Sequence, residues 1–174
     1  MHAYSDSDWA RDYDTRQSTS GNCFFLGHSC ILWLSKKQTI VATSSCETEY
    51  RAAFTATIEY VWLRRLVANL RVSLEGPTPI LTDNQSAIAV AKNLVSHARM
   101  KHIEVHYHYV RERSHVGEIS MIYIPTHENV ANIFTKALPG KNFKAFCKSL
   151  KYLLLVIDCI PCTPWHWYCR GVLK

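Results

Sequence analysis

The pattern of apolar and polar positions predicts that the chain opens with strands. Residues 21–41 are rich in aromatic and β-branched residues and are interrupted at Gly27-His28-Ser29, and residues 1–8 precede them as a further strand. Strands favour these residue types, and a short turn of this kind joins antiparallel strands. The first forty residues therefore predict three strands.

Helical patterning begins after this opening. Residues 44–70 are rich in Ala, Glu, Leu and Arg and contain neither proline nor glycine, which predicts one long helix. The later elements are predicted as a strand over 78–83, helices over 84–94 and 100–115, a strand over 118–125 and a helix over 127–138. We therefore expect an α/β fold, in which helices cover a mixed sheet and ligands bind beyond the carboxyl ends of strands.

Length, charge and cysteine content narrow the class of protein only moderately. A chain of 174 residues fits one domain, and its formal charge of +6 favours an anionic partner. Seven irregularly spaced cysteines and the lack of a leader pattern predict reduced thiols and a cytoplasmic or nuclear location. The longest apolar run, Leu153–Ile157, is far shorter than the ~20 residues that span a bilayer, so we expect no membrane anchor.

Two acidic positions are unusual for the elements that carry them. Asp6 and Asp8 lie two apart in the first strand, so they would share one face and repel each other unless water or a cation lies between them. Glu49 shares a helix face with the three alanines of residues 52–56, small residues that let a helix pack closely on a sheet. A carboxylate there needs a cation or hydrogen bonds, although a partly exposed glutamate is an equally simple explanation.

Two other acids have local explanations. Glu47 follows Ser44 by three residues, as in a capping box, and precedes Arg51 by four, so we assign it to the stability of the helix. Asp83 stands where a strand ends and a helix begins, a position that an N-cap often occupies. Both explanations compete with a functional one.

The strongest indication is the set formed by Asp6, Glu49 and Asp83. These residues come from the first strand, the first long helix and the end of a later strand. Three oxygen donors from separate elements that meet at one end of a sheet suit a hard divalent cation, and Mg²⁺ in particular bridges such donors to phosphates. The set predicts phosphodiester hydrolysis.

Five blocks of the chain carry a more specific signal. In order they are "YSDSDWARDYDTRQSTSGNCFFLG", "ILWLSKKQTIVATSSCETEYRAA", "LTDNQSAIAVAKN", "ARMKHIEVHYHYVRE" and "YIPTHENVANIFTKALP". In wording and spacing they resemble the C-terminal ribonuclease H region of copia-type LTR-retrotransposon Pol polyproteins. The resemblance implies a ribonuclease H-like mixed five-stranded sheet flanked by helices over residues 1–150. Residues 151–174 do not share it, and we interpret them as a non-family tail.

The resemblance also implies a catalytic site. Asp6, Glu49 and Asp83 correspond to the family's metal-binding carboxylates, and two Mg²⁺ ions are expected. The fourth acid of the family belongs where "VANIFTK" has Asn132. An amide oxygen brings no charge, so the second ion should bind more weakly. Glu128, one helical turn earlier, is a partial substitute, although a first-turn dipole role explains it better.

The substrate that the resemblance implies is an RNA–DNA hybrid, and a reverse transcriptase domain is the expected partner within the parent polyprotein. Asn84 and Gln85 are expected to contact the sugar edges of the hybrid, where the 2′-OH distinguishes RNA from DNA. Lys101 and Arg111, in the basic helix 100–115, are expected to contact its phosphates.

Two alternatives stay open. Asn132 and the tail favour a catalytically inactive retrotransposon remnant that retains the fold and nucleic-acid binding, whereas the intact first three acids favour an enzyme. A zinc site is the second alternative, because His102 and His106 lie four apart on a helix. No third well-placed ligand completes that site, and the C-x2-C-x3-H-x2-C pattern of the tail is too tight for a zinc knuckle.

Overall fold

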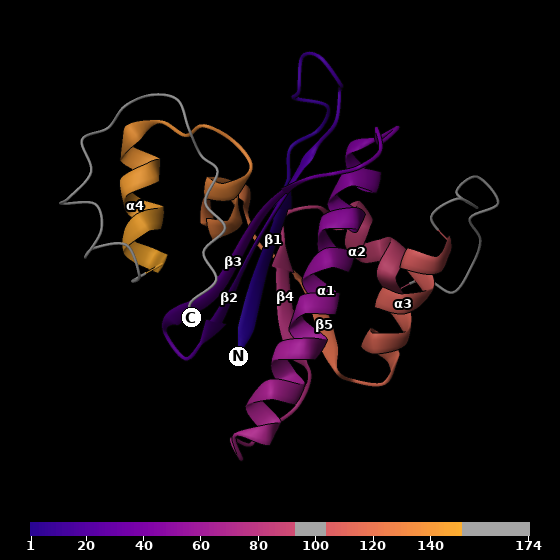
Figure 1. Ribbon diagram of the computed structural model, residues 1–174, viewed down its shortest axis with the longest axis vertical. Coiled ribbons are helices and arrows are strands. Elements are labelled where there is room, and N and C mark those ends of the chain that lie inside the picture. The colour runs from indigo at the N-terminus through magenta and orange to yellow at the C-terminus, as the bar shows by residue number, and fades with distance from the viewer. Residues whose placement is uncertain (93–103, 151–174) are drawn as a thin grey trace.

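The centre of the fold is a mixed sheet of five strands (Figure 1). The computed structural model describes residues 1–92 and 104–150. Across the sheet the strands run β3 (Ser29–Lys37), β2 (Thr19–Leu26), β1 (His2–Ser7), β4 (Thr78–Thr82) and β5 (Ile119–Tyr123). The first three strands pair antiparallel, whereas β1 with β4 and β4 with β5 pair parallel. The predicted strands and the five-stranded mixed sheet are confirmed.

Three helices cover one face of the sheet. They are α1 (Ser45–Asn69), α2 (Gln85–Lys92) and α3 (Glu104–His115), which lie together on one side in Figure 1. Ala53 and Ala56 of α1 are buried in the core that this layer shares with the sheet. Alanine adds little bulk between helix and strand, so α1 can lie close to β1 and carry a side chain to the strand end.

Helix α3 is held to α1 by aromatic side chains. Tyr50 packs on Tyr107 with ring centroids 4.1 Å apart, and Phe54 stacks on His106 at 4.0 Å. His106 is therefore a packing residue between two helices. Its suggested zinc-binding companion, His102, lies outside the described residues, as do Lys101 and the tail.

The opposite face is covered by η2 (Thr126–Glu128), η3 (Val130–Phe134) and α4 (Gly140–Leu150). The single helix predicted over 127–138 is wrong, because two short 3-10 helices occupy this stretch. Asn129 separates them: its side chain accepts from the Ala131 N–H and donates to the Ser5 carbonyl of β1 at 3.0 Å. A side chain that bonds the backbone locally competes with a continuous helix.

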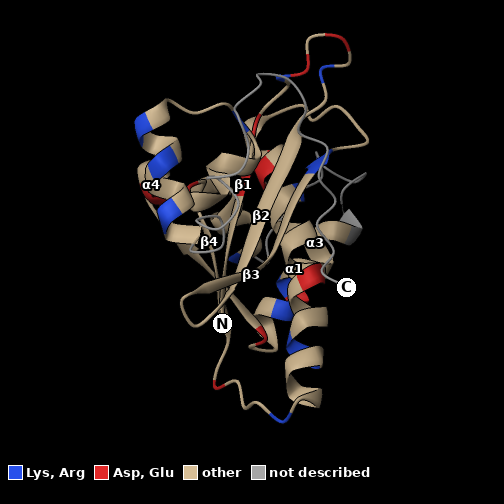
Figure 2. Cartoon of the chain, turned by 60° about the vertical axis from the view of Figure 1, so that its left-hand side comes forward, with Lys and Arg blue, Asp and Glu red and all other residues tan. Residues whose placement is uncertain are grey.

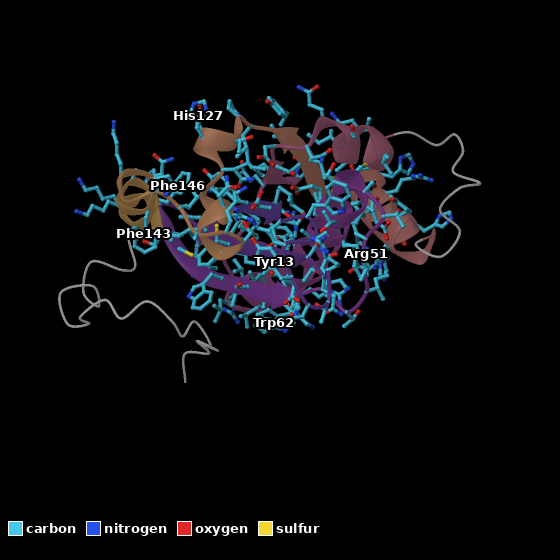
Figure 3. All side chains as sticks on the ribbon, turned by 90° about the horizontal axis from the view of Figure 1, so that it is seen from above. Tyr13, Arg51, Trp62, His127, Phe143 and Phe146 are labelled. Carbon is cyan, nitrogen blue, oxygen red and sulfur yellow. The ribbon has the colours of Figure 1, made fainter. Side chains whose placement is uncertain are left out.

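Helix α4 is not among the elements that we predicted from the sequence. Its buried positions Phe146, Cys147 and Leu150 form an apolar stripe against the sheet. Figure 3 shows Phe146 on the side of α4 that faces the body of the molecule.

Two general expectations concern the membrane and the thiols. Among the helices of the described residues, none has the length and apolarity needed to cross a membrane. Among the described residues, Cys23, Cys30, Cys46 and Cys147 are free thiols, and the reducing compartment expected from the cysteine spacing stays a prediction.

Candidate metal and nucleic-acid site

Three carboxylates from separate elements meet at one edge of the sheet. Asp6 lies in β1, Glu49 in α1 and Asp83 directly after β4. One ligand oxygen from each lies within 4.8 Å of the others. Because β1 and β4 are parallel neighbours, their carboxyl ends share this edge. The predicted convergence of the three acids is confirmed, and their role as metal ligands stays a prediction.

The cluster is buried enough to perturb the acids. Asp6 is 1% exposed and Glu49 is 7% exposed. Burial, followed by the charges of Asp6 and Asp83, raises the pKa of Glu49 to about 9. Burial also raises the pKa of Asp6, and the nearby Lys136 opposes that rise. Without a cation, these carboxylates are held in an environment that disfavours their charge.

The donor set fits a hard divalent cation. Glu49 Oε1 accepts a hydrogen bond from the Ser7 N–H at 3.4 Å. Its other oxygen, Oε2, is buried and has no hydrogen-bond partner among the described residues. A buried carboxylate oxygen without a donor calls for a ligand, and carboxylate oxygens are those that Mg²⁺ prefers.

Asp83 does not have to serve as the helix cap. The Asn84 side chain performs that function, because its Oδ1 accepts from the Ala87 N–H at 2.9 Å. Asp83, half-buried, contributes its oxygen to the cluster instead. The competing N-cap explanation of Asp83 is therefore wrong.

Glu47 is a structural residue, as predicted. Its Oε2 accepts from the N–H and the hydroxyl of Thr43, at 2.9 and 2.7 Å, and its Oε1 pairs with Arg51 at 3.1 Å. Ser44 caps the same turn by accepting from the Glu47 N–H. These bonds occupy both oxygens of Glu47.

Asp8 also has a structural partner. Its Oδ1 accepts from the N–H of Thr19, and its own N–H donates to the Thr19 carbonyl at 3.1 Å. These two bonds close the loop between β1 and β2 next to Asp6. Asp8 is therefore a neighbour of the cluster and not one of its three members.

Two residues of the site were missed by sequence reasoning. The Thr135 hydroxyl donates to Asp6 Oδ2, and the Lys136 ammonium lies 3.6 Å from the same oxygen. Both residues follow η3 and lie far from Asp6 in the sequence, so no local sequence pattern predicts their contact with Asp6. The block "VANIFTK" contains both residues.

Asn132 is buried in η3 and is used as a donor. Its Nδ2 donates to the carbonyls of Thr126 and Asn129, both at 2.8 Å, while its Oδ1 is buried without a hydrogen-bond partner among the described residues. Its own carbonyl lies 3.2 Å from the Thr135 hydroxyl that contacts Asp6. The side-chain amide of Asn132 therefore links η2 to η3. Its contact with the carboxylate cluster is indirect and runs through Thr135.

Glu128 is not placed as predicted. It belongs to η2 and not to a helix shared with Asn132, and its side chain is exposed and lies 3.5 Å from His127. Figure 3 shows His127 pointing outward at the rim of the molecule. The expected one-turn relationship between Glu128 and Asn132 depended on a continuous helix, which the chain does not form.

The predicted nucleic-acid contacts fall into different environments. Gln85 is exposed beside Asp83. Arg111 is half-buried in α3, and Arg113 is paired with Glu118 at 3.2 Å. By contrast, all three lysines of α4 are exposed, and Figure 2 shows them as blue bands along that helix: Lys141, Lys144 and Lys148.

Comparison with curated sequences finds retrotransposon proteins. The chain is 38% identical over 159 residues to the retrovirus-related Pol polyprotein from transposon RE2 of Arabidopsis thaliana. The aligned region covers 91% of this chain and 11% of that polyprotein. It is 39% identical over 150 residues to the Pol polyprotein from transposon TNT 1-94 of Nicotiana tabacum, 86% of this chain and 11% of the relative. The chain thus spans about a tenth of the relatives it matches. No protein-family model matches it.

Comparison with solved structures finds ribonuclease H folds. A ribonuclease H isolated from compost superposes with a TM-score of 0.56 at 13% identity, over 76% of this chain and 90% of that one. The same enzyme in complex with an RNA/DNA hybrid gives a TM-score of 0.52, over 73% and 86% of the two chains. At this identity the likeness establishes the fold, which is ribonuclease H-like as the sequence predicts.

Proposed function

Because this chain is a homologue of copia-type retrotransposon Pol polyproteins and has a ribonuclease H-like fold, we propose that it hydrolyses the RNA strand of RNA–DNA hybrids. The observation that carries the proposal is the convergence of Asp6, Glu49 and Asp83 at the carboxyl edge of the sheet. Three buried or half-buried oxygen donors at that edge are suited to phosphodiester chemistry.

In this proposal the three acids hold divalent cations, with Mg²⁺ as the physiological ion. Bound there, two Mg²⁺ ions would activate a water molecule and stabilise the leaving oxygen. The protein's own contribution is orientation. The Ser7 N–H fixes Glu49, and Thr135 fixes Asp6. Asn84 caps α2 and leaves Asp83 available.

Hybrid binding is assigned to groups around this edge. The hybrid complex of the compost enzyme supports a nucleic-acid duplex as the substrate of the same fold. Asn84 and Gln85 adjoin Asp83 and are proposed to contact sugar edges. Lys101 and Arg111 are proposed to contact phosphates, which gives affinity without sequence preference.

The bounds of the domain, its neighbour in the polyprotein and its cellular compartment are also proposed. We assign residues 1–150 to the catalytic domain and 151–174 to an appended tail. The relatives of this chain are Pol polyproteins of which it covers 11%, and a reverse transcriptase domain is the proposed partner within such a polyprotein. The free thiols support a reducing compartment, the cytoplasm or the nucleus.

Asn132 favours a second candidate, an inactive remnant that keeps the fold and binds nucleic acid. The fourth carboxylate of the family is absent, and the amide that replaces it is occupied with two backbone carbonyls. An enzyme with a weakly held second ion and a remnant without turnover differ in one observable, which is cleavage.

A gel assay distinguishes the two candidates. The chain is incubated with a hybrid labelled on its RNA strand, with the matching RNA duplex and with the matching DNA duplex, in Mg²⁺ or in EDTA. The enzyme proposal predicts slow cleavage of the RNA strand in the hybrid only, and only with Mg²⁺. Hybrid binding without cleavage, by protein whose circular dichroism shows the α/β fold, would establish the remnant.

A further inference from the structure

Lys136 introduces a positive charge into the carboxylate cluster. Its Nζ lies 3.6 Å from Asp6 Oδ2, and its side chain is only 27% exposed. Burial raises the pKa of Asp6, Asp8 and Glu49, and Lys136 acts in the opposite direction on all three. The ammonium therefore faces the cluster as a whole and is not an ordinary surface charge.

The backbone that carries Lys136 is fixed from several sides. The N–H groups of Thr135 and Lys136 both donate to the Asn132 carbonyl at 3.3 Å. Two residues before Lys136, the Phe134 carbonyl accepts from the Ser35 hydroxyl at 2.7 Å, and the Phe134 ring stacks on Trp33 at 5.3 Å. Since this segment is anchored to β3, the lysine side chain starts from a defined position beside β1.

Lys136 and a divalent cation compete for the same carboxylate. Asp6 is one of the three acids of the candidate metal site, and its Oδ2 already has the Thr135 hydroxyl and the Lys136 ammonium as partners. A cation bound at Asp6 would bring two positive charges close to a third. Like charges at such distances repel, so the ammonium must move away when the cation binds.

We propose, resting on the proposed function, that Lys136 is a positioning residue that acts as the resident counter-ion of the Asp6–Glu49–Asp83 cluster and is displaced by the divalent cation. In the metal-free protein it relieves the repulsion among the carboxylates and holds Asp6 in place. In the metal-bound protein its displacement lowers the affinity for the ion. Lys136 thus sets the Mg²⁺ concentration at which the site fills.

The test is direct Mg²⁺ binding, measured by isothermal titration calorimetry without substrate. Lys136→Met, which nearly keeps the length of the side chain and removes its charge, should lower the Kd for Mg²⁺ by about fivefold, because the displaced ammonium of the wild type stays near the ion with water between them. Lys136→Arg should keep the Kd of the wild type. Lys144→Met removes the same charge from the exposed side of α4 and should also keep it.

Thermal unfolding in EDTA supplies the second readout. Lys136→Met should melt below the wild type without metal and should gain more from saturating Mg²⁺, whereas Lys144→Met should follow the wild type in both conditions. An unchanged Kd in Lys136→Met, with hybrid cleavage retained by the wild type, would overturn this inference alone. Failure of the wild type to bind Mg²⁺ and to cleave would overturn both this inference and the proposed function.

Discussion

Gly21 pairs with Asp6 across the β1–β2 ladder, and its missing side chain makes room for η3 against the sheet. A Cβ at Gly21 would lie 2.6 Å from Thr135 Cγ2 and 2.9 Å from the Ala131 carbonyl oxygen. Both distances are shorter than normal contacts. The glycine therefore allows the segment that supplies Thr135 and Lys136 to reach Asp6.

Gly21→Ala should destabilise the protein by about 1–3 kcal/mol, because the added methyl group must displace packed backbone and side-chain atoms of η3. Urea denaturation measures the free energy of unfolding. The control is Gly140→Ala at the start of α4, where a Cβ would meet no atom within 4 Å. Equal stability of Gly21→Ala and wild type would show that η3 does not depend on this close approach.

The metal-free protein should lose stability as the pH rises. The pKa of Glu49 is about 9 in the folded state, raised by burial and by Asp6 and Asp83, against 4.5 ordinarily. Between these values the folded state holds a proton that the unfolded chain releases. The free energy of unfolding should therefore fall with pH across this window, by up to about 1.4 kcal/mol per pH unit for one proton.

The measurement is urea denaturation in EDTA at several pH values above about 6.5, the ordinary pKa of histidine. Below that value, the lowered pKa values of His2 and His106 act in the opposite direction. Glu49→Gln, which cannot titrate, should show a flatter profile and higher stability at alkaline pH. Parallel profiles for wild type and Glu49→Gln would contradict the perturbed glutamate.

Asn132→Asp should raise turnover and lower stability. The new carboxylate supplies the charge that the second Mg²⁺ lacks, so single-turnover cleavage of the hybrid at saturating Mg²⁺ should accelerate. The same change removes the donor to the carbonyls of Thr126 and Asn129. That loss should destabilise the metal-free protein by about 1–3 kcal/mol.

Hybrid affinity supplies the control for this variant. It should change little in Asn132→Asp, since phosphate contacts elsewhere set it. Identical cleavage rates for wild type and Asn132→Asp would mean that the second ion does not depend on position 132.

Hybrid binding should weaken steeply as salt rises, because cationic side chains release counter-ions from the phosphates. Arg111→Gln should reduce the slope of log affinity against log salt by about one. Arg113→Gln is the matched control, since Arg113 is already paired with Glu118. A slope that Arg111→Gln leaves unchanged would exclude this face of α3 from the interface.

The sequence predicts the three acids of the site better than it predicts the residues that contact and position them. Asp6, Glu49 and Asp83 could be identified because each stands at a strand end or on a sheet-facing helix position, and because their blocks match a known family in wording and spacing. Thr135 and Lys136 could not, since their contact with Asp6 exists only once η3 lies over Gly21. That approach is a tertiary relationship without a local pattern.

The errors in the C-terminal part have equally specific causes. The helix predicted over 127–138 assumes that helical composition continues through Asn129, whose side chain instead bonds Ala131 and Ser5. Helix α4 does carry a readable signal, because Phe143, Phe146, Cys147 and Leu150 recur at helical spacing. Such spacing is typical of an amphipathic helix, so this element was predictable from the sequence.

The most direct test of the proposed function is the single-turnover rate of RNA-strand cleavage in an RNA–DNA hybrid, compared between the wild type and Asp83→Asn. Asp83 is half-buried and α2 is capped by Asn84, so the variant should fold normally. We predict Mg²⁺-dependent cleavage by the wild type, abolished by EDTA and reduced about a hundredfold or more in Asp83→Asn. No cleavage by folded wild-type protein at any Mg²⁺ concentration, or equal rates for the two proteins, would contradict the proposal.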